Sequence, residues 1–479
     1  MKQTKIVASV SDLRCDVEFI RDLYEAGANV IRMNTAHATP EGLKNIIKNV
    51  REVSPNLGIL IDTKGPEVRT TGTDAPIEYK TGEIVSIVGD PSQDFTHDVI
   101  RLSYADIAKD VKVGDDILFD DGALAMKVTR NDGKKLTVVV LNDAKLGSHK
   151  SVNVPGEHID LPALTEKDKR NILLAIEEDI DFIAHSFVRS KRDLMEVQKI
   201  LDEHNSDIKI ISKIENEEGV DNIDEIIDNC YGIMIARGDL GIEIPAEKIP
   251  GIQRMIIKKC VYNKKPVIVA TQMLHTMIEN PRPTRAEVSD IANAVFNNTD
   301  ALMLSGETAS GAYPLEAVKT MARIAEQAEI DRALYLHKMD VDGADTTLRN
   351  FLCKAAIETT SKLDVQCILT DAGTGEDART LAAYRGPKPI VALCKKSKKL
   401  QRWLALSYGV VALYPDQNQP VDKMFYHTVR RYYDEGKLKL DDRVAYLSGH
   451  MNIGVSNKTT GASMLEVVTV SEIFANYEK

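Results

Sequence analysis

Two carboxylates and a lysine in this chain stand where they could hold a divalent cation beside a phosphoryl group. Residues 208–219 read IKIISKIENEEG, an apolar run that ends with Lys213 and Glu215, and another apolar run ends just before Asp239. Glu215 and Asp239 offer hard oxygen ligands, which suit Mg²⁺ or Mn²⁺ with substrate oxygens and water completing the coordination. Because phosphoryl transfer is catalysed mainly by cations around the moving group, Lys213 beside such a metal indicates that chemistry.

Similar polar pairs end six apolar runs of the chain. The pairs are Arg32 and Asn34, Asp62 and Thr63, Lys213 and Glu215, Arg237 and Asp239, Thr271 and Gln272, and Ser305 and Glu307. A polar residue at one strand end is expected by chance, but six such pairs are not. Since the carboxyl ends of the strands in a (β/α)₈ barrel meet at one mouth, we expect these side chains to form one active site.

Strand-like and helix-like segments alternate about eight times, which predicts a (β/α)₈ barrel. The strand-like runs cover residues 5–10, 28–34, 57–63, 181–187, 208–214, 231–237, 266–272 and 301–306. They are continuously apolar, as parallel strands covered on both faces must be. The clearest helix covers residues 285–296 and begins with a capping box of Thr284 and Glu287. Its apolar face is predicted to contain Val288, Ile291, Ala292 and Val295.

Two further domains are predicted beside the barrel. Residues 70–155 lack a helical period and consist of short runs joined by turns, which predicts a small antiparallel β-barrel domain inserted after the third barrel strand. That position would place it over the barrel mouth as a lid. Residues 341–479 form a separate α/β domain for regulation or oligomerisation. The catalytic barrel is therefore discontinuous, comprising residues 1–69 and 156–340.

Composition and charge exclude several classes of protein. The formal net charge is −11, which argues against nucleic acid as the main partner. Six cysteines without a C-x-x-C pair are predicted to be reduced thiols in a cytoplasmic protein. We expect no membrane segment, because no apolar run approaches the roughly 20 residues that span a bilayer, and no signal peptide pattern is present.

Seven segments resemble the pyruvate kinase family. They are IDTKGPEVRT (61–70), LPALTEKD (161–168), SKIENEEGVDN (212–222), MIARGDLGIEIP (234–245), VATQML (269–274), PRPTRAEVSDIANAV (281–295) and DALMLSGETASGAYPLEAV (300–318). The resemblance covers nearly the whole chain. It implies transfer of the phosphoryl group of phosphoenolpyruvate to ADP, giving pyruvate and ATP in the last step of glycolysis. It also implies a homotetramer with a lid domain and a C-terminal regulatory domain.

The resemblance implies a role for each residue that matches the family motifs. Glu215 and Asp239 would hold the divalent metal, Lys213 would neutralise the moving phosphoryl group, and Arg32 would bind the phosphate. The further implied groups are the backbone N–H groups near Gly238 and Asp239 for the substrate carboxylate, Thr271 near the enolate carbon, Ser305 and Glu307 for the proton supply, Arg69, His37 and Asn34 for the nucleotide, and Asn34, Asp62 and Thr63 for K⁺. Glu67 fits K⁺ dependence, since a carboxylate there accompanies it in the family.

The chain departs from the family pattern at several positions. Ala36 replaces a serine, so one K⁺ ligand is missing and we expect weaker K⁺ binding. Ser11 and Asp12 replace a glycine and proline near the nucleotide, which leaves nucleotide preference open. Asp371 and Glu376 would repel a sugar phosphate, so activation by fructose 1,6-bisphosphate is not expected. The basic run at 395–399 is predicted to be a solvated helix start.

Two alternatives remain open from the sequence. The first is another Mg²⁺-dependent (β/α)₈ enzyme of enolpyruvate chemistry, such as an aldolase or lyase, which would not need a lid domain or Lys213. The second is a non-catalytic regulatory homologue, which is disfavoured because Lys213, Glu215, Asp239 and Thr271 are all present. Metal-dependent turnover of phosphoenolpyruvate and ADP separates both from the leading interpretation.

Overall fold

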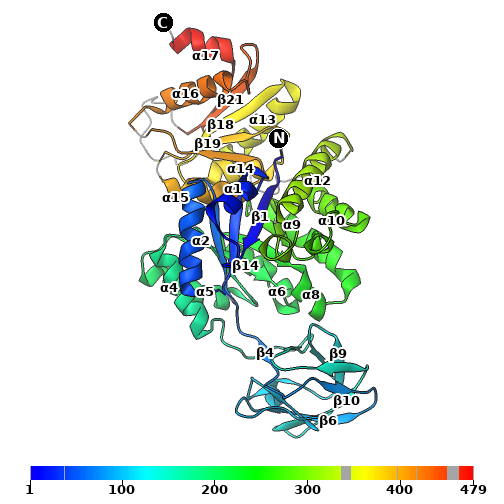
Figure 1. Ribbon diagram of the computed structural model, residues 1–479. Helices are drawn as coiled ribbons and strands as arrows, with labels where there is room; N and C mark the ends of the chain where they lie inside the picture. The colour runs from blue at the N-terminus through cyan, green and yellow to red at the C-terminus, as the bar shows by residue number, and fades with distance from the viewer. Residues whose placement is uncertain are drawn as a thin grey trace.

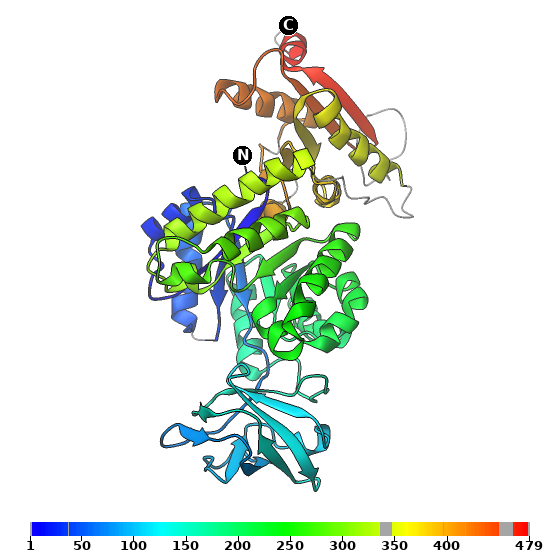
Figure 2. The same cartoon turned by 90° about the vertical axis from the view of Figure 1, so that its right-hand side faces the viewer.

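The computed structural model describes residues 2–36, 38–335, 347–395, 397–416, 418–449 and 463–477. Figures 1 and 2 show three parts in a row, with a barrel surrounded by helices in the middle. A β-rich part of residues 68–153 lies at one end of the barrel, and an α/β part from residue 347 onward lies at the other. No helix among the described residues combines the length and apolar content needed to cross a bilayer.

Eight parallel strands close into the barrel in their sequence order, so the predicted fold class is confirmed. The strands are β1 (Lys5–Val10), β2 (Val30–Asn34), β3 (Gly58–Asp62), β13 (Phe182–His185), β14 (Lys209–Ile214), β15 (Gly232–Ala236), β16 (Val267–Ala270) and β17 (Ala301–Leu304). Each lies within one of the runs predicted as barrel strands. We call the carboxyl ends of these strands, with the residues that follow them, the rim, and the amino ends the base.

Alternate residues of each strand fill the inside of the barrel and the layer beneath the helices. Val7, Leu60, Ile211 and Met234 belong to the inner core, whereas their neighbours Ile6, Ile59 and Ile210 pack against the helices. Both layers are buried, which explains why the strand sequences are apolar without alternation.

Helices cover the outside of the barrel (Figure 1). They are α1 (Val17–Glu25), α2 (Pro40–Val53), α4 (Glu166–Glu177), α5 (Lys191–Glu203), α6 (Glu217–Asp221), α7 (Ile223–Asp228), α8 (Arg237–Glu243), α9 (Ile249–Tyr262), α10 (Arg285–Phe296), α11 (Gly306–Ala309) and α12 (Pro314–Tyr335). Helix α10 begins with the predicted capping box of Thr284 and Glu287. Its buried residues are Ile291, Ala294 and Val295, and Val288 is 37% exposed, so the predicted apolar face was wrong at Val288.

The insert, which we define as β4 to β12, is a twisted sheet that closes on itself. Its elements are β4 (Val68–Arg69), β5 (Ile77–Tyr79), β6 (Ile84–Gly89), β7 (Val99–Leu102), α3 (Ile107–Asp110), β8 (Asp116–Phe119), β9 (Leu124–Asn131), β10 (Lys135–Val140), β11 (Ala144–Leu146) and β12 (Ser151–Asn153). The sheet order is β4-β12-β8-β9-β10-β6-β7. Thr71 N donates to Arg101 O at 2.9 Å and Ser103 N to Arg69 O at 2.8 Å, and these bonds join the two edge strands, β4 and β7. The β6–β7 pair is parallel, so the prediction of a purely antiparallel domain was wrong.

The C-terminal part is an α/β sheet with order β20-β19-β18-β21-β22. Its elements are α13 (Leu348–Lys362), β18 (Val365–Asp371), α14 (Glu376–Ala383), β19 (Ile390–Leu393), α15 (Lys398–Trp403), β20 (Val410–Leu413), α16 (Val421–Asp434), β21 (Arg443–Ser448), β22 (Met464–Thr469) and α17 (Val470–Tyr477). Strand β22 is antiparallel to β21, and the other pairs are parallel. All six cysteines of the chain are buried and form no disulfide, as predicted.

Candidate active site

The rim brings two cationic side chains onto one buried carboxylate. Lys213 Nζ lies 3.0 Å from Asp62 Oδ1 and 2.9 Å from Glu215 Oε1. Arg32 contacts the other oxygen, Asp62 Oδ2, through Nη2 at 2.7 Å and Nε at 2.8 Å. Burial opposes ionisation of Asp62, but Lys213 and Arg32 outweigh it and lower the pKa of this carboxyl. Asp62 therefore stays ionised and fixes both cations at the mouth of the barrel.

The lysine at the centre of this cluster remains charged. Burial alone would lower the pKa of Lys213, but Asp62 and Glu215 raise it above its ordinary value. Lys213 is almost fully enclosed, with a side chain 11% exposed. An ammonium group held in a low-dielectric pocket interacts strongly with any anion that enters beside it. The rim is thus suited to an anionic substrate.

Glu215 and Asp239 form a carboxylate pair that lacks full compensation. Burial, together with the charges of Asp239 and Asp62, raises the pKa of Glu215 to about 7 against the opposing effect of Lys213. Burial also raises the pKa of Asp239. Phe187 N donates to Glu215 Oε2 at 2.7 Å and helps to orient the carboxylate. Two buried carboxylates whose ionised forms are disfavoured fit a divalent cation, which would favour ionisation of both.

Protein side chains alone would not complete the coordination of such a cation. Among the residues that the structure describes, no group of three or more His, Cys, Asp or Glu side chains could hold a metal ion. Two carboxylates with substrate oxygens and water are a donor set typical of Mg²⁺ at phosphoryl-transfer sites. The observed pair fits the predicted metal site of Glu215 and Asp239.

Thr271 is fixed next to the segment that carries Asp239. Its hydroxyl oxygen accepts from Gly238 N at 2.8 Å and donates to Ala270 O at 2.6 Å. Thr271 and Gln272 both have positive φ, of 69° and 54°, which is a strained conformation for two successive residues with side chains. Arg237 supports this turn, because its guanidinium donates to Thr271 O at 2.8 Å.

Glu307 connects the loops that follow β16 and β17. Its Oε2 accepts from Ser305 N at 2.7 Å and its Oε1 accepts from Leu274 N at 3.1 Å. The side chain is 2% exposed. The structure therefore brings Ser305 and Glu307 together at the rim, with the Glu307 carboxylate bonded to backbone N–H groups.

The predicted K⁺ and nucleotide residues lie in different parts of the molecule. Asn34 Oδ1 accepts from Ala36 N at 3.0 Å, and Thr63 Oγ1 accepts from Ser186 N at 3.0 Å. Asn34, at the end of β2, pairs with Asp62 of β3, and Thr63 follows Asp62 in the chain. Arg69 lies in the insert, where it pairs with Glu67 at 2.6 Å. His37 lies outside the described residues.

Three polar residues near this cluster were missed by the sequence analysis. Ser9 Oγ accepts from Arg32 Nη1 at 2.9 Å, and Ser186 Oγ accepts from Lys213 Nζ at 2.8 Å. Lys167, in the first turn of α4, donates to Ala36 O at 2.7 Å. A serine near a strand end is common in any sequence, so the two serines stand out only once the structure places Arg32 and Lys213 beside them. Lys167 lies in the LPALTEKD segment, which offered a signal for it.

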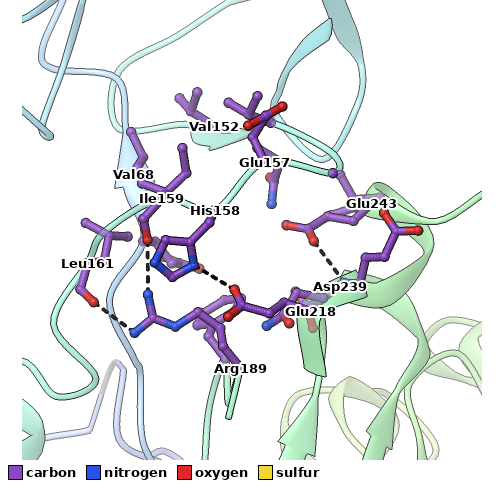
Figure 3. A pocket seen from close by; sticks show the side chains of 18 of the residues that line it. Val68, Val152, Glu157, His158, Ile159, Leu161, Arg189, Glu218, Asp239 and Glu243 are labelled. Carbon is purple, nitrogen blue, oxygen red and sulfur yellow. Dashed lines mark hydrogen bonds and ion pairs between the residues drawn. The ribbon is translucent and has the colours of Figure 1, made fainter. Parts of the chain in front are cut away.

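A cavity lies beside this cluster, between the rim and the insert (Figure 3). It has a volume of about 320 Å³. Of the residues that the sequence analysis singled out for the site, Asp239 and Glu67 line it. Figure 3 shows Arg189 directed at the backbone of Ile159 and Leu161, to which it donates at 3.0 and 2.9 Å. The cavity therefore borders the metal site on its insert side and is not centred on Lys213.

Fold and site together define a barrel enzyme that acts on phosphorylated substrates: a (β/α)₈ barrel carries an insert at its mouth, and fixed cations lie beside a carboxylate pair at its rim. Models of the pyruvate kinase barrel domain and alpha/beta domain match residues 1–318 and 350–468. The chain therefore belongs to the pyruvate kinase family, and it is a phosphotransferase.

Individual relatives agree with this assignment. The pyruvate kinase of Borreliella burgdorferi is 46% identical over 98% of both chains. That of Bacillus licheniformis is 42% identical over 99% of this chain and 82% of its own. The crystal structure of a pyruvate kinase from Cryptosporidium parvum has a TM-score of 0.89 and 33% identity, and the match covers 98% of this chain and 96% of its own. The alternatives of an aldolase or lyase and of a non-catalytic homologue are therefore not retained.

Proposed function

We propose that the rim binds phosphoenolpyruvate and ADP and transfers the phosphoryl group between them in the last step of glycolysis. The observation that carries this proposal is the Asp62 carboxylate that holds Lys213 and Arg32 side by side, each within 3.0 Å. Arg32 binds the phosphate of the substrate. Lys213 neutralises the charge that spreads over the phosphoryl oxygens as the bond breaks. Because Asp62 fixes both side chains beforehand, little reorganisation is needed in the transition state.

Glu215 and Asp239 would hold Mg²⁺ or Mn²⁺ beside Lys213. When bound, the metal supplies positive charge that stabilises the transferring phosphoryl group and the enolate oxygen. The raised pKa of both carboxyls supports this role, because their ionised forms need a compensating cation. The N–H groups near Gly238 and Asp239, at the start of α8, are proposed to receive the substrate carboxylate.

Thr271, Ser305 and Glu307 are proposed to manage the proton that the enolate carbon gains. The Thr271 hydroxyl lies beside Gly238, where the substrate carboxylate would bind. Glu307 fixes the loop of Ser305 against the loop after Thr271, so that a water held there has a constant position. Replacing Thr271 with valine should therefore slow formation of pyruvate while phosphoryl transfer from phosphoenolpyruvate to ADP continues.

The nucleotide is proposed to bind between the rim and the insert, with contacts from Arg69, His37 and Asn34. Asn34, Asp62 and Thr63 are proposed to bind K⁺, with water in place of the hydroxyl that Ala36 lacks. Both oxygens of Asp62 already contact cationic side chains, which supports weak K⁺ binding. A titration of activity against K⁺ should show activation at high concentration. Full activity in K⁺-free buffer would exclude the site.

The remaining proposals concern the domains, the oligomeric state and the location of the protein. We propose that residues 1–69 and 156–340 form the catalytic domain, that 70–155 form a lid, and that 341–479 serve regulation or assembly of a homotetramer. The six buried thiols support a cytoplasmic location. Analytical ultracentrifugation should give a mass near four chains, and a monomer at micromolar concentration would contradict the tetramer.

The activity itself is tested by a lactate-dehydrogenase-coupled assay with phosphoenolpyruvate and ADP. Turnover should require Mg²⁺ or Mn²⁺ and should disappear when the metal is removed with a chelator. Turnover that persists at full rate without a divalent cation would refute the metal site. A complete lack of pyruvate formation with metal, K⁺ and both substrates present would refute the proposed reaction.

A further inference from the structure

Each of the two rim cations contacts one oxygen of Asp62 and one serine hydroxyl, and Lys213 also contacts Glu215. Lys213 Nζ contacts Asp62 Oδ1 at 3.0 Å and Ser186 Oγ at 2.8 Å. Arg32 contacts Asp62 Oδ2 at 2.7 Å and, through Nη1, Ser9 Oγ at 2.9 Å. The serines come from the end of β1 and from the residue after β13, the two strands whose ends gave no polar pair in the sequence analysis.

Both hydroxyl groups are fixed by their own hydrogen bonds. Ser9 Oγ donates to Leu304 O at 2.8 Å. Ser186 Oγ donates to Thr63 O at 2.7 Å, a shorter contact than its 3.3 Å distance to Asp62 Oδ1. A hydroxyl has a single proton. When it donates that proton to a carbonyl oxygen, it can act toward other groups only as an acceptor. Each serine therefore presents an oriented acceptor to its cation.

The burial of these serines makes the arrangement rigid. Ser9 and Ser186 are each 2% exposed. Ser186 is also tied through its backbone, because Ser186 N donates to Thr63 Oγ1 at 3.0 Å. Water does not compete readily for hydrogen bonds at such depth, and a charge-assisted bond there is both strong and directional.

We propose that Ser186 and Ser9 are positioning residues for the phosphoryl-transfer reaction, Ser186 for Lys213 and Ser9 for Arg32. The inference rests on the proposed roles of those two cations. Asp62 anchors both cations and Glu215 is a second ion contact of Lys213, and each serine adds the neutral acceptor that completes the set around its cation. Lys213 then has an acceptor for each of its three N–H bonds, and Arg32 is held at Nε, Nη2 and Nη1, so neither cation can turn without breaking a hydrogen bond.

The two serines should differ in their kinetic effect. Lys213 acts on charge that develops in the transition state, so a misdirected ammonium lowers kcat. Arg32 binds the phosphate in the ground state as well, so a misdirected guanidinium raises KM for phosphoenolpyruvate. A purely structural role of either serine would instead lower thermal stability without separating kcat from KM.

The test compares Ser186→Ala and Ser9→Ala in the full chain with Mg²⁺ and K⁺ present. Ser186→Ala should lower kcat by about 10- to 100-fold with KM for phosphoenolpyruvate changed less than about 3-fold. Ser9→Ala should raise that KM by about 10-fold with a smaller change in kcat. Ser9→Thr and Ser186→Thr restore a hydroxyl and should recover most of the activity.

Ser212→Ala is the matched control. Ser212 is fully buried and precedes Lys213 on β14, but it points to the opposite face of the strand. Removing the Ser212 hydroxyl should leave kcat and KM unchanged.

Ser186→Cys serves as a second variant at the test position, because the added methyl of Ser186→Thr has to fit a crowded site. Cysteine is close to serine in size, but its sulfur is only a weak acceptor. This variant should melt like the wild type and still lose turnover.

Two results would overturn the inference. Wild-type kcat in both Ser186→Ala and Ser186→Cys would show that the serine does not position Lys213. Equal losses in Ser186→Ala and in the Ser212 control would show a general packing effect. Lys213→Met, measured alongside, separates this failure from failure of the proposed function: if Lys213→Met is inactive while the Ser186 variants are normal, only the positioning role is wrong.

Discussion

Buried charges occur at both ends of the barrel, and the two clusters differ in how completely they are paired. At the base, Asp181 accepts from Arg51 at 2.8 Å, from Arg402 at 2.5 Å and from Ile59 N at 2.8 Å. At the rim, Glu215 has contacts with Lys213 and with Phe187 N, but its neighbour Asp239 adds negative charge. Two arginines compensate the charge of Asp181, whereas Lys213 only partly offsets the effect of burial on Glu215 and Asp239.

This difference separates a stabilising role from a chemical one. The base cluster joins the barrel to the C-terminal part, because Arg402 belongs to α15 and Asp181 immediately precedes β13. The rim cluster keeps carboxylates whose pKa values are raised and a lysine directed at the mouth. We therefore expect changes at the rim to alter turnover or ligand binding, and changes at the base to alter stability.

The largest effect is expected for Lys213→Met. Turnover should fall by about 10³-fold, because the lost charge acts in the transition state, while phosphoenolpyruvate still binds through Arg32. Lys209→Met is the control on the same strand, at the base end, where Lys209 Nζ lies 4.0 Å from the ring of Trp403. It should leave kcat unchanged. A tenth of normal turnover in Lys213→Met would contradict the account.

His185 ends β13 beside the rim cluster and has no ion pair with it. It is fully buried, and burial lowers its pKa to about 4 despite the nearby carboxylates Asp193 and Asp168. The unfolded chain binds this proton near pH 6.5, so stability is present above that pH and is lost as pH falls toward 4. The loss is on the order of 3 kcal/mol. Denaturant unfolding at several pH values should show a shallower pH dependence in His185→Gln, and identical slopes would contradict the prediction.

Divalent cations should stabilise the rim specifically. Mn²⁺ at about 100 times its dissociation constant should raise the free energy of unfolding by about 2.7 kcal/mol, because it binds the folded state. Glu215→Gln should lose most of this gain. Glu217→Gln, which changes a carboxylate in the first turn of α6, is the control and should keep it. Thermal melts with and without Mn²⁺ measure both, and an equal gain in all three proteins would place the ion elsewhere.

The smallest effect is expected at the base. Arg402→Met should lower the free energy of unfolding by about 1.5–3 kcal/mol, since it removes a charged hydrogen bond to Asp181 while Arg51 remains. The kcat of the folded protein should stay within about 2-fold of the wild type. Denaturant midpoints and steady-state kinetics on the same preparation check this. A loss of turnover without a loss of stability would reverse the distinction between base and rim.

The barrel and most of its rim could be predicted because their signals are local. Each strand is a short apolar run whose last polar residue marks the rim, and a closed parallel sheet brings such ends together. The Asp62 contacts with Lys213 and Arg32 follow from that geometry, although the sequence analysis assigned Asp62 to K⁺ by resemblance alone. Both oxygens of its side chain contact the two cations, and the K⁺ assignment stays a prediction.

Contacts between distant segments could not be predicted, because residue type alone does not choose a partner. Ser9 and Ser186 are ordinary strand-end serines until Arg32 and Lys213 lie beside them. The basic run at 395–399 suggested a solvated helix start, but Lys399 bonds to Asp179 and Asp207 of the barrel at 2.5 Å. Those carboxylates are about 200 positions away in the sequence.

The central claim is that Glu215 and Asp239 hold one divalent cation beside Lys213. Anomalous diffraction from a crystal soaked in Mn²⁺ tests it most directly. The account predicts a single strong peak within coordination distance of both carboxylates, at roughly 2.0–2.3 Å from an oxygen of each. A peak away from these two side chains, with the rim showing none, would contradict it.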